Sequence, residues 1–264
     1  MAESEKQPIL KLEHINKRFG AVQALRDMTF EAYLGEVVSL VGDNGAGKST
    51  LIKTISGAYQ PDSGKYIFDG REVTVTNPKD ATDLGIQTVY QDLALCDNLD
   101  VVANMYLGRE EVGGGVLDEV DMEHNALRFV QDLHVRIPSV RTRIAALSGG
   151  QRQSVAVARA VMWNSKVVLL DEPTAALGVE QTMQVKDLIR RLRENGLAVV
   201  VISHNLADVF DVSDRIIVMR LGTRVATFTT HTTNQEQVVA AITGAVFGEP
   251  KPTNGAETDA PDMA

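Results

Sequence analysis

Residues 42–50 read GDNGAGKST, directly after the apolar run VVSLV at 37–41. The stretch fits the spacing G-x-x-x-x-G-K-[ST], and the helix-compatible segment STLIKTISG begins near its end. Glycines at this spacing let a backbone turn tightly and point its N–H groups at phosphate oxygens. We therefore predict a loop that binds nucleotide phosphates. Its residues are Gly42, Asp43, Asn44, Gly45, Ala46, Gly47, Lys48, Ser49 and Thr50.

A second apolar run, VVLLDE, ends in two carboxylates, Asp171 and Glu172. Lys48 supplies positive charge to the β- and γ-phosphates, and the Ser49 hydroxyl is a ligand for Mg²⁺. Asp171 holds the same ion through water, and Glu172 is placed to polarise the attacking water as a general base. His204 closes the run VVVISH and is placed to reach the γ-phosphate from a neighbouring strand. Together these residues predict a site that hydrolyses a nucleoside triphosphate.

Residues 147–151 read LSGGQ and predict the start of a helix. Ser148 is a suitable N-cap, and Gly149 and Gly150 expose backbone N–H groups beside Gln151, so the helix dipole makes this an anion site. One nucleotide needs only one phosphate cradle, so this second cradle has no phosphate of its own within the chain. We predict a head-to-tail homodimer in which each copy's LSGGQ covers the γ-phosphate bound by the other copy.

Strand-like and helix-like segments alternate along the chain, which is typical of an α/β domain. Strand candidates are 9–15, 37–42, 65–73 (a hairpin turning at Asp69-Gly70), 166–173, 197–204 and 214–226. Helical periodicity marks 100–107, 121–134 and 151–163, with GGG at 113–115 as a flexible loop. We predict a single domain over 8–247 with a helical lobe at about 92–163, and a disordered tail over 248–264, rich in Pro, Gly and acidic residues.

Composition argues against several classes of protein. Of 264 residues, 44% are hydrophobic and 23% are charged, as in an ordinary soluble globular chain. The N-terminus MAESEKQPIL is acidic where a secretory signal needs a basic run, and no apolar run approaches the ~20 residues of a membrane-spanning helix. The formal net charge of −9 disfavours nonspecific binding to nucleic acid. We expect a cytosolic protein unless another component holds it to a membrane.

The motifs, taken in order, resemble those of the ATP-binding-cassette (ABC) ATPases. GDNGAGKST resembles the Walker A motif, VYQD with Gln91 the Q-loop, LSGGQ the signature, VVLLDEP the Walker B motif and ISH the switch histidine. Phe19 in KRFG stands where the family has an aromatic ring that stacks on adenine. The resemblance covers about 9–225. It implies a mixed-sheet ATPase core, an antiparallel β lobe, an inserted α-helical lobe, bound ATP and Mg²⁺, and Gln91 as a further Mg²⁺ ligand and catalytic residue.

More narrowly, YQDLALCDNLDVVANMYLGRE and DEPTAALGVEQT resemble the ATP-binding subunits of the ribose, xylose and fructose group of importers. Many of these carry two cassettes in one chain, whereas this chain has one set of motifs and would pair with itself. The resemblance implies integral-membrane permease subunits as partners and an extracytoplasmic sugar-binding protein as an indirect one. It places the chain on the cytoplasmic side of the inner membrane, as a peripheral subunit.

One position departs from the family pattern. The wider family has an aspartate in SALD after the Walker B motif, and this chain has AALG with Gly178 there. That aspartate orders the dimer interface and the attacking water, so its loss leaves open a slowly hydrolysing, nucleotide-binding regulator. A third alternative is a non-transport ABC ATPase that acts on nucleic acid or ribosomes. That class usually has long coiled-coil insertions, zinc modules or two cassettes, which are not evident in this sequence.

Overall fold

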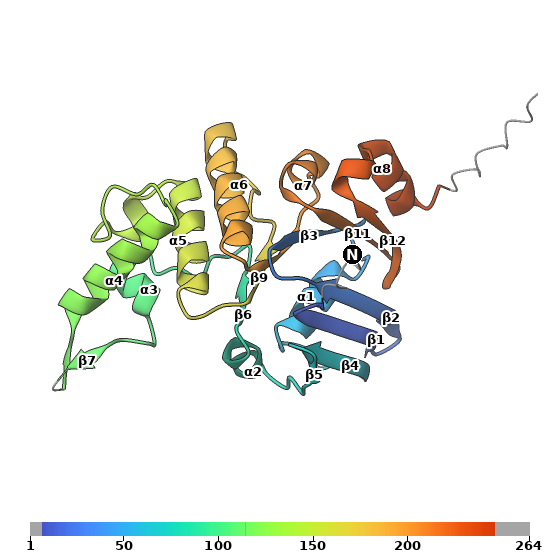
Figure 1. Ribbon diagram of the computed structural model, residues 1–264, viewed down its shortest axis with the longest axis horizontal. Coiled ribbons are helices and arrows are strands. Elements are labelled where there is room, and N and C mark those ends of the chain that lie inside the picture. Colours follow the sequence, from blue (N-terminus) through green and yellow to red (C-terminus); the bar gives the residue numbers. More distant parts are fainter. Residues whose placement is uncertain (1–6, 114, 246–264) are drawn as a thin grey trace, which may run out of the picture.

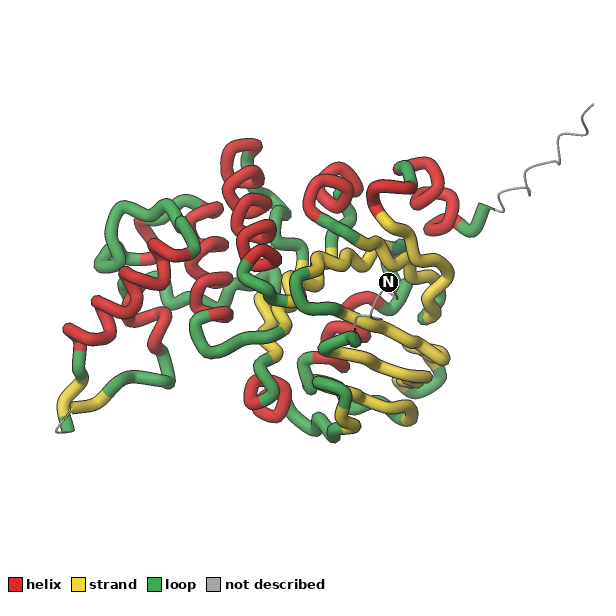
Figure 2. The backbone as a smooth tube through the Cα atoms, in the orientation of Figure 1, coloured by secondary structure: helices red, strands yellow, loops and turns green. Residues whose placement is uncertain are grey.

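A six-stranded sheet forms the centre of the protein (Figures 1 and 2). The computed structural model describes residues 7–113 and 115–245, so the tail predicted over 248–264 lies outside the described residues. In spatial order the strands are β12 (Thr223–Thr229), β11 (Arg215–Arg220), β3 (Glu36–Val41), β10 (Ala198–Ile202), β9 (Val167–Asp171) and β6 (Ile86–Val89). β12 pairs antiparallel with β11, and the other neighbours pair in parallel, so the sheet is mixed.

The central strands are apolar along most of their length because both faces of the sheet are covered. Side chains alternate between the two faces of a strand. In β3, Val38 and Leu40 pack in one apolar cluster with α1 (Lys48–Ile55), whereas Val37 belongs to a second cluster on the opposite face. Val41 ends the strand fully buried. The sheet therefore fixes the point at which the phosphate loop begins.

A four-stranded antiparallel sheet packs with α1 in the same cluster as Val38 and Leu40. Its strands, in spatial order, are β2 (Val22–Ala32), β1 (Leu10–Phe19), β4 (Ser63–Phe68) and β5 (Arg71–Glu72). The buried Tyr66 hydroxyl donates a hydrogen bond of 2.9 Å to the carbonyl of Ile55, which ties β4 to the last turn of α1. The hairpin predicted around Asp69-Gly70 is confirmed, since β4 and β5 pair across that turn.

A helical lobe projects to one side of the sheets (Figure 1). It contains α3 (Val101–Tyr106), α4 (Glu119–Asp132) and α5 (Gly149–Val161), with a 3₁₀ turn over Ile144–Ala146 before α5. Asp100, Asp118 and Ser148 cap the three helices through their side-chain oxygens. The flexible loop predicted at 113–115 is wrong in part, because β7 (Val112–Gly113) pairs with β8 (Val116–Leu117). The flanking β-branched valines favour that extended pairing.

Further helices cover the outer surfaces of the sheets. They are α2 (Pro78–Asp83), α6 (Val179–Glu194), α7 (Leu206–Val212) and α8 (Gln235–Thr243), with a 3₁₀ turn over Thr230–Thr232. The single strand predicted over 214–226 is a hairpin, since Leu221 and Gly222 both have positive φ and form the tight turn between β11 and β12. Among the described residues, no helix combines the length and apolar character of a membrane span. The predicted α/β architecture, with its mixed core sheet, antiparallel sheet and helical lobe, is confirmed.

Candidate functional site

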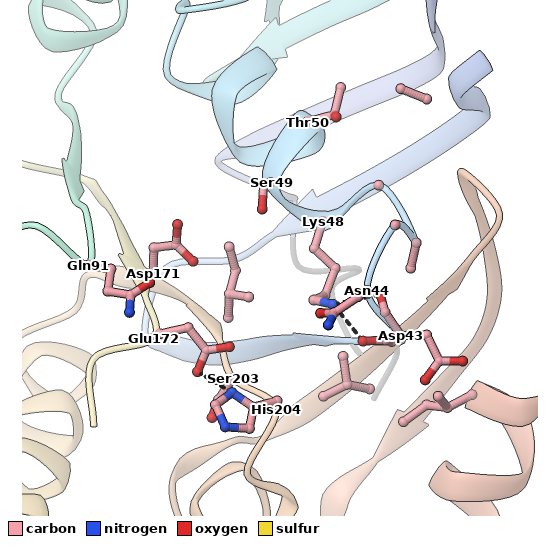
Figure 3. Close-up of a pocket in the computed structure, with 18 of the residues that line it drawn as sticks. Asp43, Asn44, Lys48, Ser49, Thr50, Gln91, Asp171, Glu172, Ser203 and His204 are labelled. Carbon is pink, nitrogen blue, oxygen red and sulfur yellow. Dashed lines mark hydrogen bonds and ion pairs between the residues drawn. The ribbon is translucent and has the colours of Figure 1, made fainter. Parts of the chain in front are cut away.

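A cavity of about 910 Å³ opens at the carboxyl ends of β3, β9 and β10 (Figure 3). Open parallel sheets bind ligands at this edge because the loops that follow the strands converge there. The whole of the loop 42–50 lines the cavity, together with the predicted residues Gln91, Asp171, Glu172 and His204. Segments that lie far apart in the sequence thus meet around one volume.

The phosphate loop takes a conformation that its glycines make possible. Gly42, Gly45 and Gly47 have φ of 149°, 80° and 100°, in the region that disfavours residues with a Cβ. A Cβ on Gly47 would also lie only 2.7 Å from the carbonyl oxygen of Ala24. α1 begins directly after Gly47, so its N-terminal N–H groups face the cavity as an anion site.

Lys48 is half-buried at the start of α1 and reaches back over the loop. Its Nζ donates hydrogen bonds to the carbonyl oxygens of Gly42 at 2.5 Å and Asp43 at 3.0 Å. Burial lowers the pKa of Lys48, while the nearby carboxylates of Glu172, Asp43 and Asp171 oppose that shift. A phosphate anion in the loop would supply a closer partner for this ammonium group.

Glu172 and His204 both line the cavity and contact each other (Figure 3). His204 Nδ1 lies 2.9 Å from Glu172 Oε2, and the imidazole is 76% exposed, whereas the carboxylate side chain is 18% exposed. Glu172 has a φ of 49°, and its N–H donates to the carbonyl of Ile202 at 2.9 Å. A left-handed non-glycine residue directly after a buried strand is a strained position of the kind that clusters at functional sites.

Ser49, Gln91 and Asp171 lie near one another around one part of the cavity (Figure 3). Their side-chain oxygens are hard donors, which suit Mg²⁺ bound by few protein ligands and by nucleotide phosphates. Burial, and then the neighbouring Glu172 carboxylate, raise the pKa of Asp171. A divalent cation would offset that unfavourable charge, so the donor set fits the ion. Within the described residues, no group of three or more His, Cys, Asp or Glu side chains forms a separate metal site.

The signature residues lie outside this cavity. Ser148 Oγ accepts from the Gln151 N–H at 3.3 Å, and Gln151 Oε1 accepts from the Ser148 N–H at 2.9 Å, which completes a capping box. Ser148 and Gly149 are exposed, but Gly150 is buried against Gln181 of α6, where a Cβ would lie 2.8 Å from the Gln181 Cβ. The close packing of α5 on α6 therefore requires a residue without a side chain at position 150. The exposure of the Gly149 and Gly150 backbone N–H groups to an anion stays a prediction.

Phe19, the predicted adenine-stacking ring, is not among the residues that line the cavity. It is 42% exposed at the end of β1, and its ring packs edge-on against Tyr59 with a centroid distance of 5.1 Å. Val22, Gln23 and Ala24, which follow the turn after Phe19, do line the cavity. The ring therefore lies at the margin of the site, and its role in adenine binding stays a prediction.

Sequence reasoning missed several lining residues. Ser203, Leu206 and Ile242 line the cavity from the end of β10, from α7 and from α8. Ser203 directly precedes the predicted His204, so its place in the site could have been predicted from that neighbour. Ile242 lies in the C-terminal helix, far along the chain from the phosphate loop, and its sequence surroundings give no sign of the contact. Thr50 lines the cavity but lies on the far side of Ser49 from the carboxylates (Figure 3).

A phosphate loop opposite a strand-end Asp–Glu pair, with a helical lobe carrying a second anion site, defines a nucleoside-triphosphate hydrolase of the ABC class. The sequence profile of the ABC transporter family matches residues 25–175. The chain belongs to this family and is an ATPase.

Several curated relatives align over most of the chain. It is 43% identical to the xylose/arabinose import ATP-binding protein of Sulfolobus acidocaldarius over 91% of this chain and 96% of that protein. It is 44% identical to the fructose import ATP-binding protein of Rhizobium meliloti over 90% and 95%. For the ribose import ATP-binding protein 2 of Escherichia coli O157:H7, the identity is 38% over 90% of this chain but only 47% of that protein.

Solved structures share the fold over nearly the whole described chain. A nucleotide-free ATP-binding cassette from an ABC transporter superposes with a TM-score of 0.75 at 25% identity, covering 90% of this chain and 96% of that one. A dimeric bacterial ABC transporter cassette gives a TM-score of 0.71 at 26% identity, covering 84% and 98%. The family resemblance drawn from the motifs is therefore confirmed.

Proposed function

We propose that this chain is the energy-coupling ATPase subunit of an ABC importer for a monosaccharide. Relatives named for the import of xylose or arabinose, fructose and ribose support the sugar class. The chain would act as a head-to-tail homodimer docked on integral-membrane permease subunits, at the cytoplasmic side of the inner membrane, with an extracytoplasmic sugar-binding protein supplying the substrate. The observation that carries the proposal is the separation of the signature helix from the cavity within one chain.

Because the two anion-binding parts are separated within one chain, a dimer is needed to bring both to the same nucleotide. The exposed N-terminus of α5 provides donors for an anion, yet none of 148–151 lines the chain's own cavity. In a head-to-tail pair, Ser148 and Gly149 of one copy would cover the γ-phosphate held on Lys48 of the other. A bacterial ABC transporter cassette of similar fold has a dimeric structure, which supports the formation of a dimer.

Different residues of the site would bind the phosphates, activate the water and hold Mg²⁺. Lys48 and the N–H groups of the loop bind the phosphates, and Glu172 orients and deprotonates the attacking water. His204, held against Glu172, is exposed and free to contact the γ-phosphate. When bound through Ser49, Gln91 and Asp171, Mg²⁺ neutralises charge on the β- and γ-phosphates.

A groove centred on Trp163 is the surface that we assign to the permease. Trp163 borders three hollows. Residues of α2, of α5 and of the segment after α3 line two of them, and the β4–β5 hairpin and the end of α2 line the third. Tyr106 packs edge-on against its ring at 5.4 Å, and the Arg109 guanidinium lies 5.1 Å from the ring centroid. One hollow continues to Tyr90 and Asp92, the neighbours of Gln91, so a segment bound there would contact the nucleotide site through that residue.

Glu172→Gln tests the proposed chemistry. Glutamine keeps the shape of the side chain but removes the base, so we expect turnover to fall by about 10²-fold or more. Because the bound ATP then persists, a stable dimer of the variant should accumulate with ATP and Mg²⁺. ATPase assays and size-exclusion chromatography with light scattering measure the two effects. Near-normal hydrolysis by the variant would remove Glu172 from its assigned role.

The alternatives predict different results in the same assays. A slowly hydrolysing regulator would show wild-type turnover equal to that of a Lys48→Ala control. An ATPase that acts on nucleic acid or ribosomes would show salt-sensitive binding to DNA or RNA, with ATPase stimulation. The net charge of −9 argues against an ATPase that acts on nucleic acid.

A further inference from the structure

Glu172 and His204 lie on separate loops, and their contact depends on how these loops are held. Glu172 directly follows β9, and His204 is the second residue after β10, so the sheet sets the starting point of each loop but not its path. The positive φ of Glu172 adds a conformational cost, which surrounding contacts must offset. The contacts that fix these loops are therefore part of the hydrolytic site.

The carboxylate of Asp208 joins the two loops. Asp208 lies in the first turn of α7 and is only 8% exposed. Its Oδ2 accepts a hydrogen bond of 2.8 Å from Thr174 Oγ1 and one of 3.0 Å from Asn205 Nδ2. Thr174 lies two residues after Glu172, and Asn205 lies directly after His204. A single oxygen atom thus connects both loops close to the hydrolytic pair.

Lys186 of α6 balances the charge of this carboxylate. Its Nζ lies 3.4 Å from Asp208 Oδ1 and 2.7 Å from Asp211 Oδ2, and its side chain is 16% exposed. Both oxygens of Asp208 therefore have partners, as a buried carboxylate requires. Hydrogen bonds to an ionised acceptor are also stronger than neutral ones, which makes the Thr174 contact a firm link between the loops.

We propose that Asp208 is a positioning residue for hydrolysis, which acts through Thr174 and Asn205 to hold Glu172 against His204. The inference rests on the proposed role of Glu172 as the general base. Asp208 does not line the nucleotide cavity, so its effect reaches the reaction only through the two loops. Loosening the link lowers turnover and leaves ATP affinity unchanged.

The direct test changes Thr174, because removing Asp208 would take one of two carboxylate partners from the partly buried Lys186 and endanger folding. Thr174→Val keeps the branched shape but has no hydroxyl to donate, whereas Thr174→Ser keeps the hydroxyl. We expect Thr174→Val to lower kcat about tenfold with KM changed less than about twofold, which corresponds to the loss of one hydrogen bond. Thr174→Ser should retain kcat within about threefold of the wild type.

Asp211→Asn is the matched control. Asp211 belongs to the same helix and binds the same Lys186, but it contacts neither Thr174 nor Asn205. The Asp211→Asn variant should have a lower thermal stability than the wild type and an unchanged kcat. If Asp211→Asn lowers kcat as much as Thr174→Val does, general destabilisation explains the loss and the positioning role is overturned.

The turnover of a Lys48→Ala variant serves as the baseline for no hydrolysis. It shows whether the hydrolytic function fails or only the positioning role of Asp208. If wild-type turnover equals that baseline, the hydrolytic function fails, and the positioning role fails with it. If the wild type hydrolyses ATP, Glu172→Gln does not, and Thr174→Val matches Thr174→Ser, only the positioning role of Asp208 is overturned. A selective loss of kcat in Thr174→Val supports it.

Discussion

At the scale of single residues, Gly178 stands where the family resemblance leads us to expect an aspartate. It is the N-cap of α6, with φ −71° and ψ 167°, an extended conformation open to any residue. Glycine offers no side-chain acceptor, and the N–H of Gly178 has only a long hydrogen bond of 3.4 Å to Gln181 Oε1. The helix therefore begins without the cap that Asp, Asn, Ser or Thr would provide.

Gly178→Asp should stabilise the protein. No atom lies within 4 Å of a Cβ built there, a carboxylate would accept from the first N–H groups of α6, and its charge would complement the helix dipole. We expect the free energy of unfolding to rise by about 0.5–1 kcal/mol, or a few °C in Tm for a chain of this size. Thermal or denaturant unfolding measures the change.

Gly196→Asp serves as the comparison at the opposite end of α6. Gly196 has a φ of 85°, so a side chain there is strained, and the added negative charge would lie near the negative end of the helix dipole. This variant should be less stable than the wild type. A loss of stability in Gly178→Asp would contradict the capping geometry described for Gly178.

Much of the candidate site was predictable at the residue scale because its motifs are local. The glycines of 42–50, Lys48 and the pair Asp171–Glu172 lie around one cavity, as their spacing suggested, although their roles stay predictions. Contacts between residues far apart in the chain could not be predicted from the sequence. The link from Thr174 to Asp208 spans 34 positions, and nothing in the residue types marks the two as partners.

At the scale of elements, a cluster of charges joins α6 to α7 behind the hydrolytic loops. Lys186 Nζ and Arg190 Nη2 lie 2.7 Å and 2.6 Å from the two carboxylate oxygens of Asp211. The hydrogen bond from Lys186, assisted by Arg190, lowers the pKa of Asp211 below its ordinary value. The folded state therefore favours the ionised carboxylate more than the unfolded state does.

This shift predicts how Asp211→Asn changes stability with pH. A carboxylate with a lowered folded-state pKa stabilises the protein above its unfolded-state pKa of about 3.9, and the contribution is lost as pH falls through the folded-state value. The wild type should therefore be more stable than Asp211→Asn at neutral pH, and the two should converge in acid. Chemical unfolding from pH 7 down to about pH 3 measures the difference. A gap that stays constant over that range would contradict the assignment.

The elements that sequence patterns predicted are the continuously apolar ones. β3, β9 and β10 are buried on both faces, so their composition marks them as strands. β2 was missed, because its register against β1 shifts at several irregular positions and its exposed residues break the apolar alternation. β6 has only four residues and carries too little pattern to be recognised.

At the scale of the whole molecule, we propose partners for two surfaces of the described chain. The exposed N-terminus of α5 suits the nucleotide of a second copy, and the groove around Trp163 suits a permease segment. Sequence patterns alone predicted the first surface. For the second, family resemblance implied a permease partner but not its binding surface, because the groove is assembled from α2, α3 and α5, which lie far apart in the chain.

The most direct test of the central claim is to identify what binds the chain in a native membrane. A tagged Glu172→Gln chain, solubilised gently with ATP and Mg²⁺, is captured, and its partners are identified by mass spectrometry. A matched variant that also carries Arg109→Glu, an exposed change beside Trp163, serves as the control for the groove. The account predicts that a polytopic permease is recovered with Glu172→Gln and lost with the added groove change. Capture of the chain alone, or with ribosomes or nucleic acid, would contradict it.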